Sequence, residues 1–157
     1  MRTLCQAKGK KMIDSEKKYL LNKMNSVAAK VGLGDLLDST LAVAKATLDV
    51  ASLGGAVGDI SLGVTIPSGA VIKKVYIVIK TAFTSAGGAG TLALKAQSAG
   101  DLLAAIDADT LSGVVAGIPE GTAANMIVLT ADRVLTATVA VEALTAGKAD
   151  VFVEYVV

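Results

Sequence analysis

The sequence predicts a mainly β protein: an antiparallel β-sandwich, jelly-roll-like in outline, preceded by an amphipathic basic helix. Three features of the chain support this prediction. Apolar and polar residues alternate through most of the sequence after residue 44, glycine-rich turns separate the alternating segments, and basic residues gather before residue 31. Roughly eight short strands joined by turns are typical of a sandwich or jelly roll. A parallel α/β sheet would instead need strands that alternate with long helices.

Composition indicates a single domain that associates with other subunits. The chain has 157 residues, which suits one domain with an appended segment. Hydrophobic residues make up 53% of it, yet aromatic residues make up only 3% and tryptophan is absent. The apolar excess therefore consists of small side chains such as alanine and valine. A surplus of this kind indicates surface that is buried against other copies, so we expect a homo-oligomer.

Charge divides the chain into a basic arm, residues 1–43, and a mildly acidic body, residues 44–157. Eight of the 15 basic residues lie in the first 30 positions, where only Asp14 and Glu16 oppose them. The nearly neutral total therefore conceals a basic arm that favours contact with an acidic surface.

The arm contains a predicted helix from about residue 12 to residue 31. Its apolar residues recur at helical spacing and form one stripe: Ile13, Leu20, Met24, Val27 and Val31. Gly32 follows at the position of a helix end. Three interpretations are open. The helix packs its stripe on the body, docks on a neighbouring subunit or a different protein, or lies on a membrane surface, which the absence of Trp and Phe from the stripe disfavours.

From Ala44 onward the apolar period becomes two, the period of a half-buried strand. In the first half of the body, strands are expected at residues 44–50, 60–66, 71–83 and 91–97. Leu53-Gly54-Gly55-Ala56 predicts a hairpin between the first two strands. Gly87-Gly88-Ala89-Gly90 predicts a loop between the last two.

The second half of the body is less regular. Residues 102–106 predict a short strand or one helical turn, and residues 107–121 predict a loop with a brief element at Val114-Val115. The last strands are expected at residues 126–129, 134–142 and 149–157, with a turn at Thr145-Ala146-Gly147 before the final one. Four residues of the second-last strand are expected to face the core: Leu135, Ala137, Val139 and Val141.

Missing residue types exclude several kinds of site. The sequence has no histidine and one cysteine, Cys5. Histidine-based acid–base catalysis, a Ser-His-Asp triad, a Cys-His pair and a His/Cys zinc site are therefore excluded. Charged residues and glycines interrupt each long apolar stretch, so we expect no membrane-spanning helix and no membrane partner. The sequence predicts a non-enzymatic protein without cofactor or metal.

One motif matches a cofactor-binding pattern. Gly88-Ala89-Gly90-Thr91-Leu92-Ala93 fits the dinucleotide fingerprint G-x-G-x-x-A. The fingerprint needs a helix after the glycines, because the helix N-terminus faces the pyrophosphate. Residues 91–97 alternate as a strand does, so we interpret the motif as a glycine-rich loop.

Other motifs also have structural interpretations. Ser15-Glu16-Lys17-Lys18 matches the S-x-x-K of acyl-transfer enzymes, but the companion motifs are missing. Asp107 and Asp109 resemble two ligands of a calcium loop, yet Leu111 occupies the next alternate position, where such a loop needs Asp or Asn. Tyr19 is the only aromatic residue of the arm, and base stacking needs aromatic platforms. We therefore expect no sequence-specific nucleic-acid binding.

An ordered set of strand and turn motifs runs through the body: Leu53-Gly54-Gly55-Ala56-Val57-Gly58, Leu62-Gly63-Val64-Thr65-Ile66-Pro67, Phe83-Thr84-Ser85, Gly117-Ile118-Pro119, Gly121-Thr122-Ala123-Ala124, Leu135-Thr136-Ala137-Thr138-Val139-Ala140-Val141-Glu142-Ala143-Leu144-Thr145-Ala146-Gly147-Lys148 and Val153-Glu154-Tyr155-Val156. In this order the motifs resemble the small β-sandwich virion proteins of tailed bacteriophages, of the capsid decoration or head-fibre type. Residues 1–43 lie outside the resemblance.

The resemblance implies a structural protein on the capsid surface of the virion, trimeric, with the major capsid protein as its partner and no catalytic residues. Combined with the basic arm, it predicts that the helix docks on the shell and that the assembly stabilises the capsid. The residues expected to dock are Lys10, Lys11, Ile13, Lys17, Lys18, Leu20, Lys23 and Met24.

A second hypothesis is a head-fibre or tail and neck component that binds a host surface or glycan. Its loops would be residues 84–90 and 107–121. Glycan sites commonly stack a sugar on an aromatic ring, and neither segment contains one. Capsid decoration is therefore the preferred hypothesis.

Overall fold

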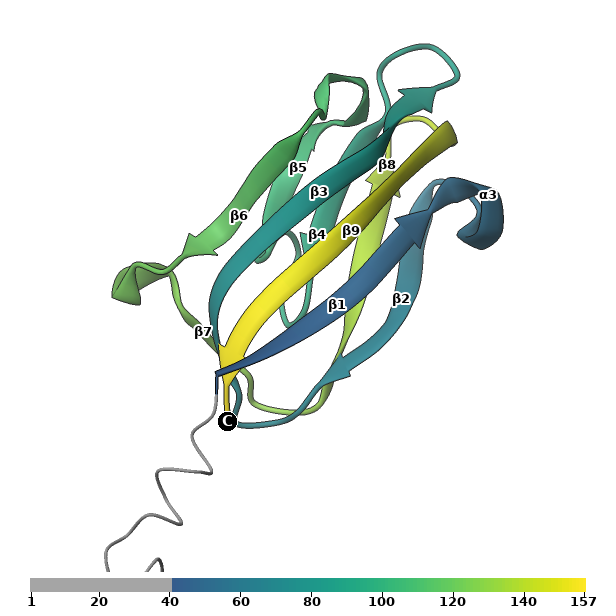
Figure 1. Cartoon of the computed structure of the whole chain (residues 1–157). Helices are drawn as coiled ribbons and strands as arrows, with labels where there is room; N and C mark the ends of the chain where they lie inside the picture. Colours follow the sequence, from purple (N-terminus) through teal and green to yellow (C-terminus); the bar gives the residue numbers. More distant parts are fainter. Residues whose placement is uncertain (1–40) are drawn as a thin grey trace, which may run out of the picture. The chain divides into compact units, whose positions relative to one another are not determined.

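The computed structural model describes residues 41–157, and strands dominate this part of the chain (Figure 1). The predicted helix at residues 12–31 lies outside the described residues. β1 begins at Leu41, three positions before the alternation in the sequence becomes clear at Ala44.

The described chain runs through short and long strands in succession. They are β1 (Leu41–Asp49), β2 (Gly58–Ile66), β3 (Val71–Ser85), β4 (Thr91–Lys95), β5 (Leu103–Asp107), β6 (Val114–Glu120), β7 (Ile127–Val128), β8 (Arg133–Ala140) and β9 (Leu144–Val156). Single helical turns interrupt them at α3 (Val50–Leu53), η1 (Ala108–Thr110) and η2 (Ala123–Asn125).

The strands form two antiparallel sheets. The front sheet has the order β1-β9-β3-β6, with β7 beside β3, and the back sheet has the order β2-β8-β4-β5. Figure 1 shows the front sheet nearer the viewer and the back sheet behind it. The prediction of a mainly β, antiparallel protein is therefore confirmed.

One hydrophobic core lies between the two sheets, and both contribute to it. Buried residues of the front sheet include Ala46, Ile77 and Val151, and those of the back sheet include Leu92 and Leu135. Small and branched aliphatic residues dominate, and Phe83 is the largest fully buried side chain. Burial of these side chains stabilises the fold by about 25 cal/mol per Å² of apolar surface removed from water.

The alternation expected for the first and third strands is confirmed. Leu48 is buried in β1 while its neighbour Thr47 is exposed, and Val75 and Ile77 are buried in β3 on either side of Tyr76. A period of two thus identifies the buried side of these strands correctly.

The predicted hairpin between the first two strands is wrong. β1 pairs with β9 and β2 pairs with β8, so the two strands belong to different sheets. The connection is α3, whose start is capped by the Asp49 carboxylate accepting from the Ala51 N–H at 3.1 Å. Gly54, with φ of 82°, ends it. Gly54 and Gly55 therefore lie in the connection that carries the chain from one sheet to the other.

The predicted loop at residues 107–121 is also wrong in part, because β6 occupies residues 114–120 and pairs with β3. Gly117-Ile118-Pro119 has the composition of a loop. Pro119 is tolerated because it lies where the register between β3 and β6 shifts, between the pairs Tyr76–Ala116 and Lys74–Glu120, so no regular ladder bond is lost. A β-carbon at Gly117 would lie 2.4 Å from the Leu102 carbonyl oxygen, so close packing rather than turn formation requires this glycine.

Val141 does not face the core as expected. Its side chain is 70% exposed, because β8 ends at Ala140 and Val141 turns the chain with φ of 68°. A positive φ is uncommon for a β-branched residue and marks this turn as strained.

The predicted turn at residues 145–147 is instead the beginning of β9, which runs without a break from Leu144. Gly147 lies inside the strand with φ of 136°, and an ideal β-carbon there would lie 2.0 Å from Cδ1 of Phe83. The buried phenylalanine ring therefore covers the position that any other side chain would need.

This packing predicts the effect of replacing Gly147. We expect G147A to lower the free energy of unfolding by about 2–4 kcal/mol, because it adds overpacking against Phe83 to the cost of an unfavourable backbone conformation. Urea unfolding followed by circular dichroism measures the change. Gly54 also has a positive φ but no atom within 4 Å of its ideal β-carbon, so G54A serves as the control and should cost only about 1–2 kcal/mol. Equal losses for the two variants would contradict the role of Phe83.

Candidate assembly surface

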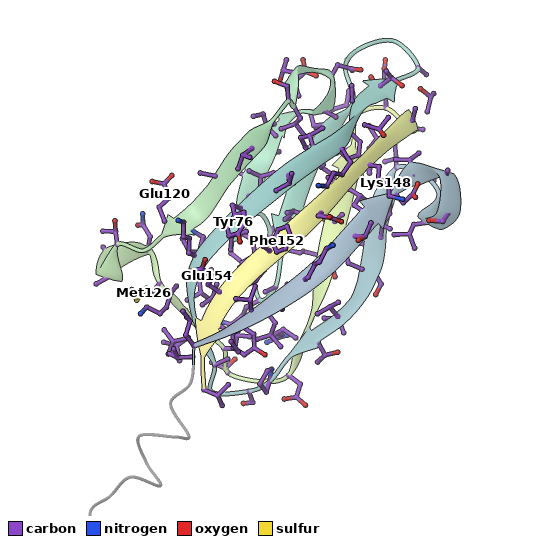
Figure 2. All side chains as sticks on the ribbon, in the orientation of Figure 1. Tyr76, Glu120, Met126, Lys148, Phe152 and Glu154 are labelled. Atoms are coloured by element: carbon purple, nitrogen blue, oxygen red, sulfur yellow. The ribbon has the colours of Figure 1, made fainter. Side chains whose placement is uncertain are left out.

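The outward side chains of the front sheet form one continuous surface, which we call the outer face. Antiparallel register brings them into rows that cross the sheet. One such row joins Lys45 of β1, Phe152 of β9, Tyr76 of β3 and Ala116 of β6. In Figure 2 the labelled Tyr76 and Phe152 lie side by side over the middle of this sheet.

Two aromatic rings form the centre of the outer face. The rings of Tyr76 and Phe152 are stacked with their centroids 5.0 Å apart and an angle of 11° between their planes. The ammonium group of Lys45 lies 5.6 Å from the Phe152 centroid, and that of Lys74 lies 5.9 Å from the Tyr76 centroid. Such cation–π contacts and the stacking fix the aromatic side chains relative to the sheet.

Ion pairs join neighbouring strands on the same face. Lys45 Nζ lies 3.0 Å from Asp150 Oδ2, and the Thr47 hydroxyl donates to Asp150 Oδ1 at 2.8 Å. Nearer the far end of β1, Lys148 Nζ lies 2.8 Å from Asp49 Oδ2. Both pairs join β1 to β9, so charges on this part of the face are neutralised within the sheet.

These contacts shift the pKa of each carboxyl in one direction. The hydrogen bond from Lys45, helped by that from Thr47, holds the pKa of Asp150 below its ordinary value. The hydrogen bond from Lys148 likewise lowers the pKa of Asp49, and the same contact raises the pKa of Lys148. Both carboxyls therefore stay charged at neutral pH.

At the other end of the outer face the side chains are apolar. Register places Leu41, Val156, Val71 and Val128 in one row across β1, β9, β3 and β7. Val43 borders this row on β1. We call these five residues the apolar patch: Leu41, Val43, Val71, Val128 and Val156. Leu41 and Val128 are each 58% exposed and Val43 is 54% exposed, so the patch lies on the surface and not in the core.

Beside the apolar patch, charged residues alternate in sign. Glu154, Lys74 and Glu120 are register neighbours across β9, β3 and β6. Within residues 41–157 none of them belongs to an ion pair. Within the described domain, this row therefore places charges of both signs next to an apolar surface.

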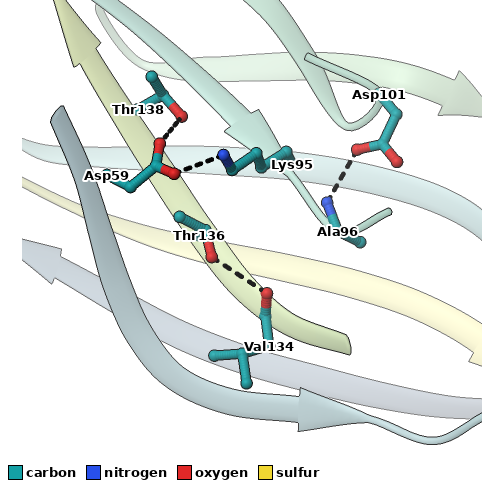
Figure 3. Close-up of polar contacts among 7 residues, drawn as sticks. All are labelled: Asp59, Lys95, Ala96, Asp101, Val134, Thr136 and Thr138. Atoms are coloured by element: carbon teal, nitrogen blue, oxygen red, sulfur yellow. Dashed lines mark hydrogen bonds and ion pairs between the residues drawn. The ribbon is translucent and has the colours of Figure 1, made fainter. Parts of the chain in front are cut away.

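The outer side of the back sheet carries a different polar cluster (Figure 3). Asp59 of β2 forms an ion pair with Lys95 of β4 and accepts a hydrogen bond from the Thr138 hydroxyl of β8 at 2.7 Å. The Lys95 hydrogen bond is the main reason that the pKa of Asp59 is lowered. The cluster joins three strands and leaves no free nucleophile or base at its centre.

A shallow hollow beside this cluster is lined by small side chains. Its volume is about 340 Å³, and the lining residues are Ala93, Ala99, Gly100, Ala104, Ala105 and Thr138. None of these side chains ionises near neutral pH, so the hollow offers no acid, base or metal ligand.

The loops at the far end of the domain, where β8 ends and β9 begins, are held by carboxylates. Glu142 Oε2 accepts from the Gly87 N–H at 2.7 Å and the Ala89 N–H at 3.3 Å, which fixes the glycine-rich loop. Asp109 accepts from the Ser85 N–H and hydroxyl at 3.0 and 2.7 Å. The interpretation of Gly88–Ala93 as a loop followed by a strand is confirmed, because β4 follows it directly.

The acidic residues considered for calcium also have structural partners. The Asp107 carboxylate accepts from the Asp109 N–H at 3.0 Å and caps η1. Within residues 41–157, no group of three or more His, Cys, Asp or Glu side chains is arranged to hold a metal ion. In the same part of the chain, no helix combines the length and hydropathy that crossing a membrane requires.

The docking residues expected from the sequence, Lys10 to Met24, lie outside the described residues. The sequence pattern indicated neither the apolar patch nor the aromatic pair. Lys45, Tyr76 and Phe152 are distant in sequence, and only the pairing of β1, β9 and β3 brings them together. Alternation predicted a strand at residues 71–83, but it gave no information on which strands are its neighbours.

The ion pairs predict how stability depends on pH. Asp49, Asp59 and Asp150 each have a pKa below the ordinary value of 3.8 in the folded protein. Their contribution to stability is complete above that value and is lost as pH falls through the lower folded pKa. We therefore expect the urea midpoint to fall below about pH 4, and D150N to weaken this dependence. A midpoint that D150N leaves equally sensitive to acid would contradict the prediction for this pair.

Comparison with known proteins places this fold among phage capsid structures. No protein-family model and no curated protein matches the chain. A chain in the acidic stable capsid of Helicobacter pylori bacteriophage KHP30 matches with a TM-score of 0.57 and 18% identity, covering 76% of this chain and 90% of that one.

Two further capsid structures agree. A chain in the capsid asymmetric unit of cyanophage Pam1 has a TM-score of 0.59 and 18% identity, covering 76% of this chain and 86% of that one. A chain in the capsid of Ralstonia phage GP4 has a TM-score of 0.53 and 18% identity, with coverages of 74% and 84%. The resemblance of the body to phage virion proteins is thus confirmed as a shared fold.

Proposed function

We propose that the protein is a structural component of a tailed-phage virion that decorates and stabilises the capsid surface. The observation that carries the proposal is the fold shared with chains in three phage capsids, each matched over at least 84% of its own length. A match over most of both chains indicates a whole module of the same kind and not a common local motif.

The order of strand pairing supports a jelly-roll sandwich, an architecture found in viral capsid domains. If the short β7 is set aside, the first strand pairs with the last, β2 pairs with β8, β3 with β6 and β4 with β5. Nested pairs of this kind arise when one long antiparallel hairpin is rolled into two sheets. We infer that the front and back sheets form such a sandwich.

A non-enzymatic role fits the chemistry of the described surface. Histidine is absent from the sequence, and several carboxylates are occupied by lysines or backbone N–H groups, as Asp150 and Glu142 illustrate. Groups held in this way fix strands and loops, whereas a general base or nucleophile must reach a substrate.

Attachment through the basic arm and association into trimers complete the proposal. The arm concentrates positive charge that favours an acidic shell surface, and its apolar stripe supplies a hydrophobic contact beneath the lysines. Alanine- and valine-rich surfaces that bury against other copies would add to the stability of the lattice. The arm residues assigned to docking are Lys10, Lys11, Ile13, Lys17, Lys18, Leu20, Lys23 and Met24.

The alternative is a head-fibre or tail component that binds a host surface or glycan through its loops. The tethering of the Thr84–Gly90 loop by Glu142 and Asp109 makes it rigid, as a recognition loop can be. It contains no aromatic ring on which a sugar could stack. Decoration therefore remains the preferred proposal.

The two proposals predict different copy numbers. Quantitative mass spectrometry of purified virions should find this chain in hundreds of copies per particle if it decorates the shell, because a lattice offers a site at each symmetry-related position. A fibre or tail component would be present in few copies. Its absence from virions would contradict both proposals.

Docking through the arm is tested by neutralising its lysines in the full-length chain. Binding to purified heads that lack this protein should weaken at least tenfold, a loss of about 1.4 kcal/mol, and should become less sensitive to salt. In this variant, glutamine replaces five lysines of the arm: Lys10, Lys11, Lys17, Lys18 and Lys23.

The control replaces lysines of the described domain that lie outside the apolar patch and its charged border, Lys80 and Lys95. It removes positive charge without touching the arm. Unchanged affinity of the arm variant, or equal losses in the two variants, would show that the arm is not the docking element.

A further inference from the structure

We infer that the apolar patch is a second contact with the shell, so that the domain stands on the capsid on this end of its front sheet. The inference rests on the proposed function and deepens it by assigning an orientation. The partner is a surface of the shell protein that is apolar and bordered by charged side chains. The far end, which carries the glycine-rich loop, then points away from the shell.

Exposure and geometry make the patch suitable for contact. Its residues come from four adjacent strands and lie in register on one side of a sheet, so they form a continuous surface. Leu41, Val43 and Val128 are each more than half exposed. Contiguous exposed apolar surface on a folded domain marks an interaction site more often than scattered single residues do.

The point at which the arm joins the domain favours the shell as the partner of the apolar patch. Residues 1–40 enter the domain at Leu41, which is itself a member of the patch. Nine residues separate Leu41 from Val31, the end of the predicted helix. An extended chain covers at most about 3.6 Å per residue, so the steps from Val31 to Leu41 span no more than about 36 Å. A shell-bound arm therefore keeps this end of the domain near the shell.

Charge around the patch supports the same partner. Glu154, Lys74 and Glu120 alternate in sign beside it and form no ion pairs within the described residues. Farther along the outer face, Lys45 and Lys148 are already paired with aspartates. Glu154, Lys74 and Glu120 thus border the patch and take no part in the ion pairs of residues 41–157.

A second group of exposed apolar residues lies at the opposite end and provides the competing orientation. It consists of Leu53, Val57 and Val141, at 44%, 58% and 70% exposure. These residues come from α3 and from two turns rather than from one sheet surface. The arm does not enter the domain there.

The test compares two double variants of the full-length protein for binding to purified heads that lack it. V43T/V128T replaces two patch valines by the nearly isosteric threonine, which strands accept. V57T/V114T is the control, because Val57 and Val114 are 58% and 70% exposed outside the patch. Urea unfolding and light scattering of each free protein establish that the fold and the oligomer are retained.

We expect V43T/V128T to bind heads about 10- to 100-fold more weakly than the wild type, because two hydroxyls would be buried in an apolar contact. The control should bind within about twofold of the wild type, as expected for surface changes outside a contact. Equal affinity of V43T/V128T and wild type would overturn the inference. A loss in the control alone would also overturn it and would indicate the opposite orientation.

Two further outcomes distinguish a failure of this inference from a failure of the proposed function. If V43T/V128T dissociates the free oligomer, the patch is a contact between copies of this chain, and the inference is wrong. If the wild-type protein itself does not bind heads, the proposed function fails, whatever the variants do.

Discussion

The position of β9 between β1 and β3 is the constraint on which the rest of the domain depends. Along β9, one set of alternate residues enters the core and the other forms the outer face. Val151 and Val153 are buried, whereas Phe152 and Glu154 face outward. Its pairing with β1 joins residues 41–49 to residues 148–156, so the fold and the outer face are fixed by the same hydrogen-bonded ladders.

The outer face divides into parts with different physical properties. Near the far end, lysine and aspartate pairs join β1 to β9, and exposed pairs of this kind contribute little to stability. Their main effect is to pair the charges of Lys45 and Lys148 with aspartates of the same sheet. In the middle of the face, the rings of Tyr76 and Phe152 stack on each other. At the end where the arm enters, apolar side chains are exposed beside charges that form no ion pair within residues 41–157, which makes this end the part of the face best suited to a partner.

Sequence patterns predicted the strands better than their arrangement. Alternation located β1, β3, β4 and β8, because each has one side in the core. It did not reveal β6, since Gly117 and Pro119 have the composition of a loop and only edge pairing with β3 makes them a strand. Alternation also does not show which strands share a sheet. For this reason Gly54 and Gly55 predicted a hairpin, although they connect strands of different sheets.

The candidate surface was less predictable than the fold. The apolar patch combines residues from β1, β3, β7 and β9, and such a set is defined only after the pairing is known. Composition nevertheless indicated exposed apolar surface, and the patch is one of the places where the described domain exposes it. The docking residues of the arm remain a prediction from the sequence.

The central claim is that one end of this domain faces a capsid shell. Cryo-electron microscopy of the intact virion tests it most directly, because a density map shows which end of each domain meets the lattice. We predict the end with Leu41 and Val128 against the shell and the loop held by Glu142 in solvent. A map with that loop against the shell, or with no such domain on the particle, would contradict the account.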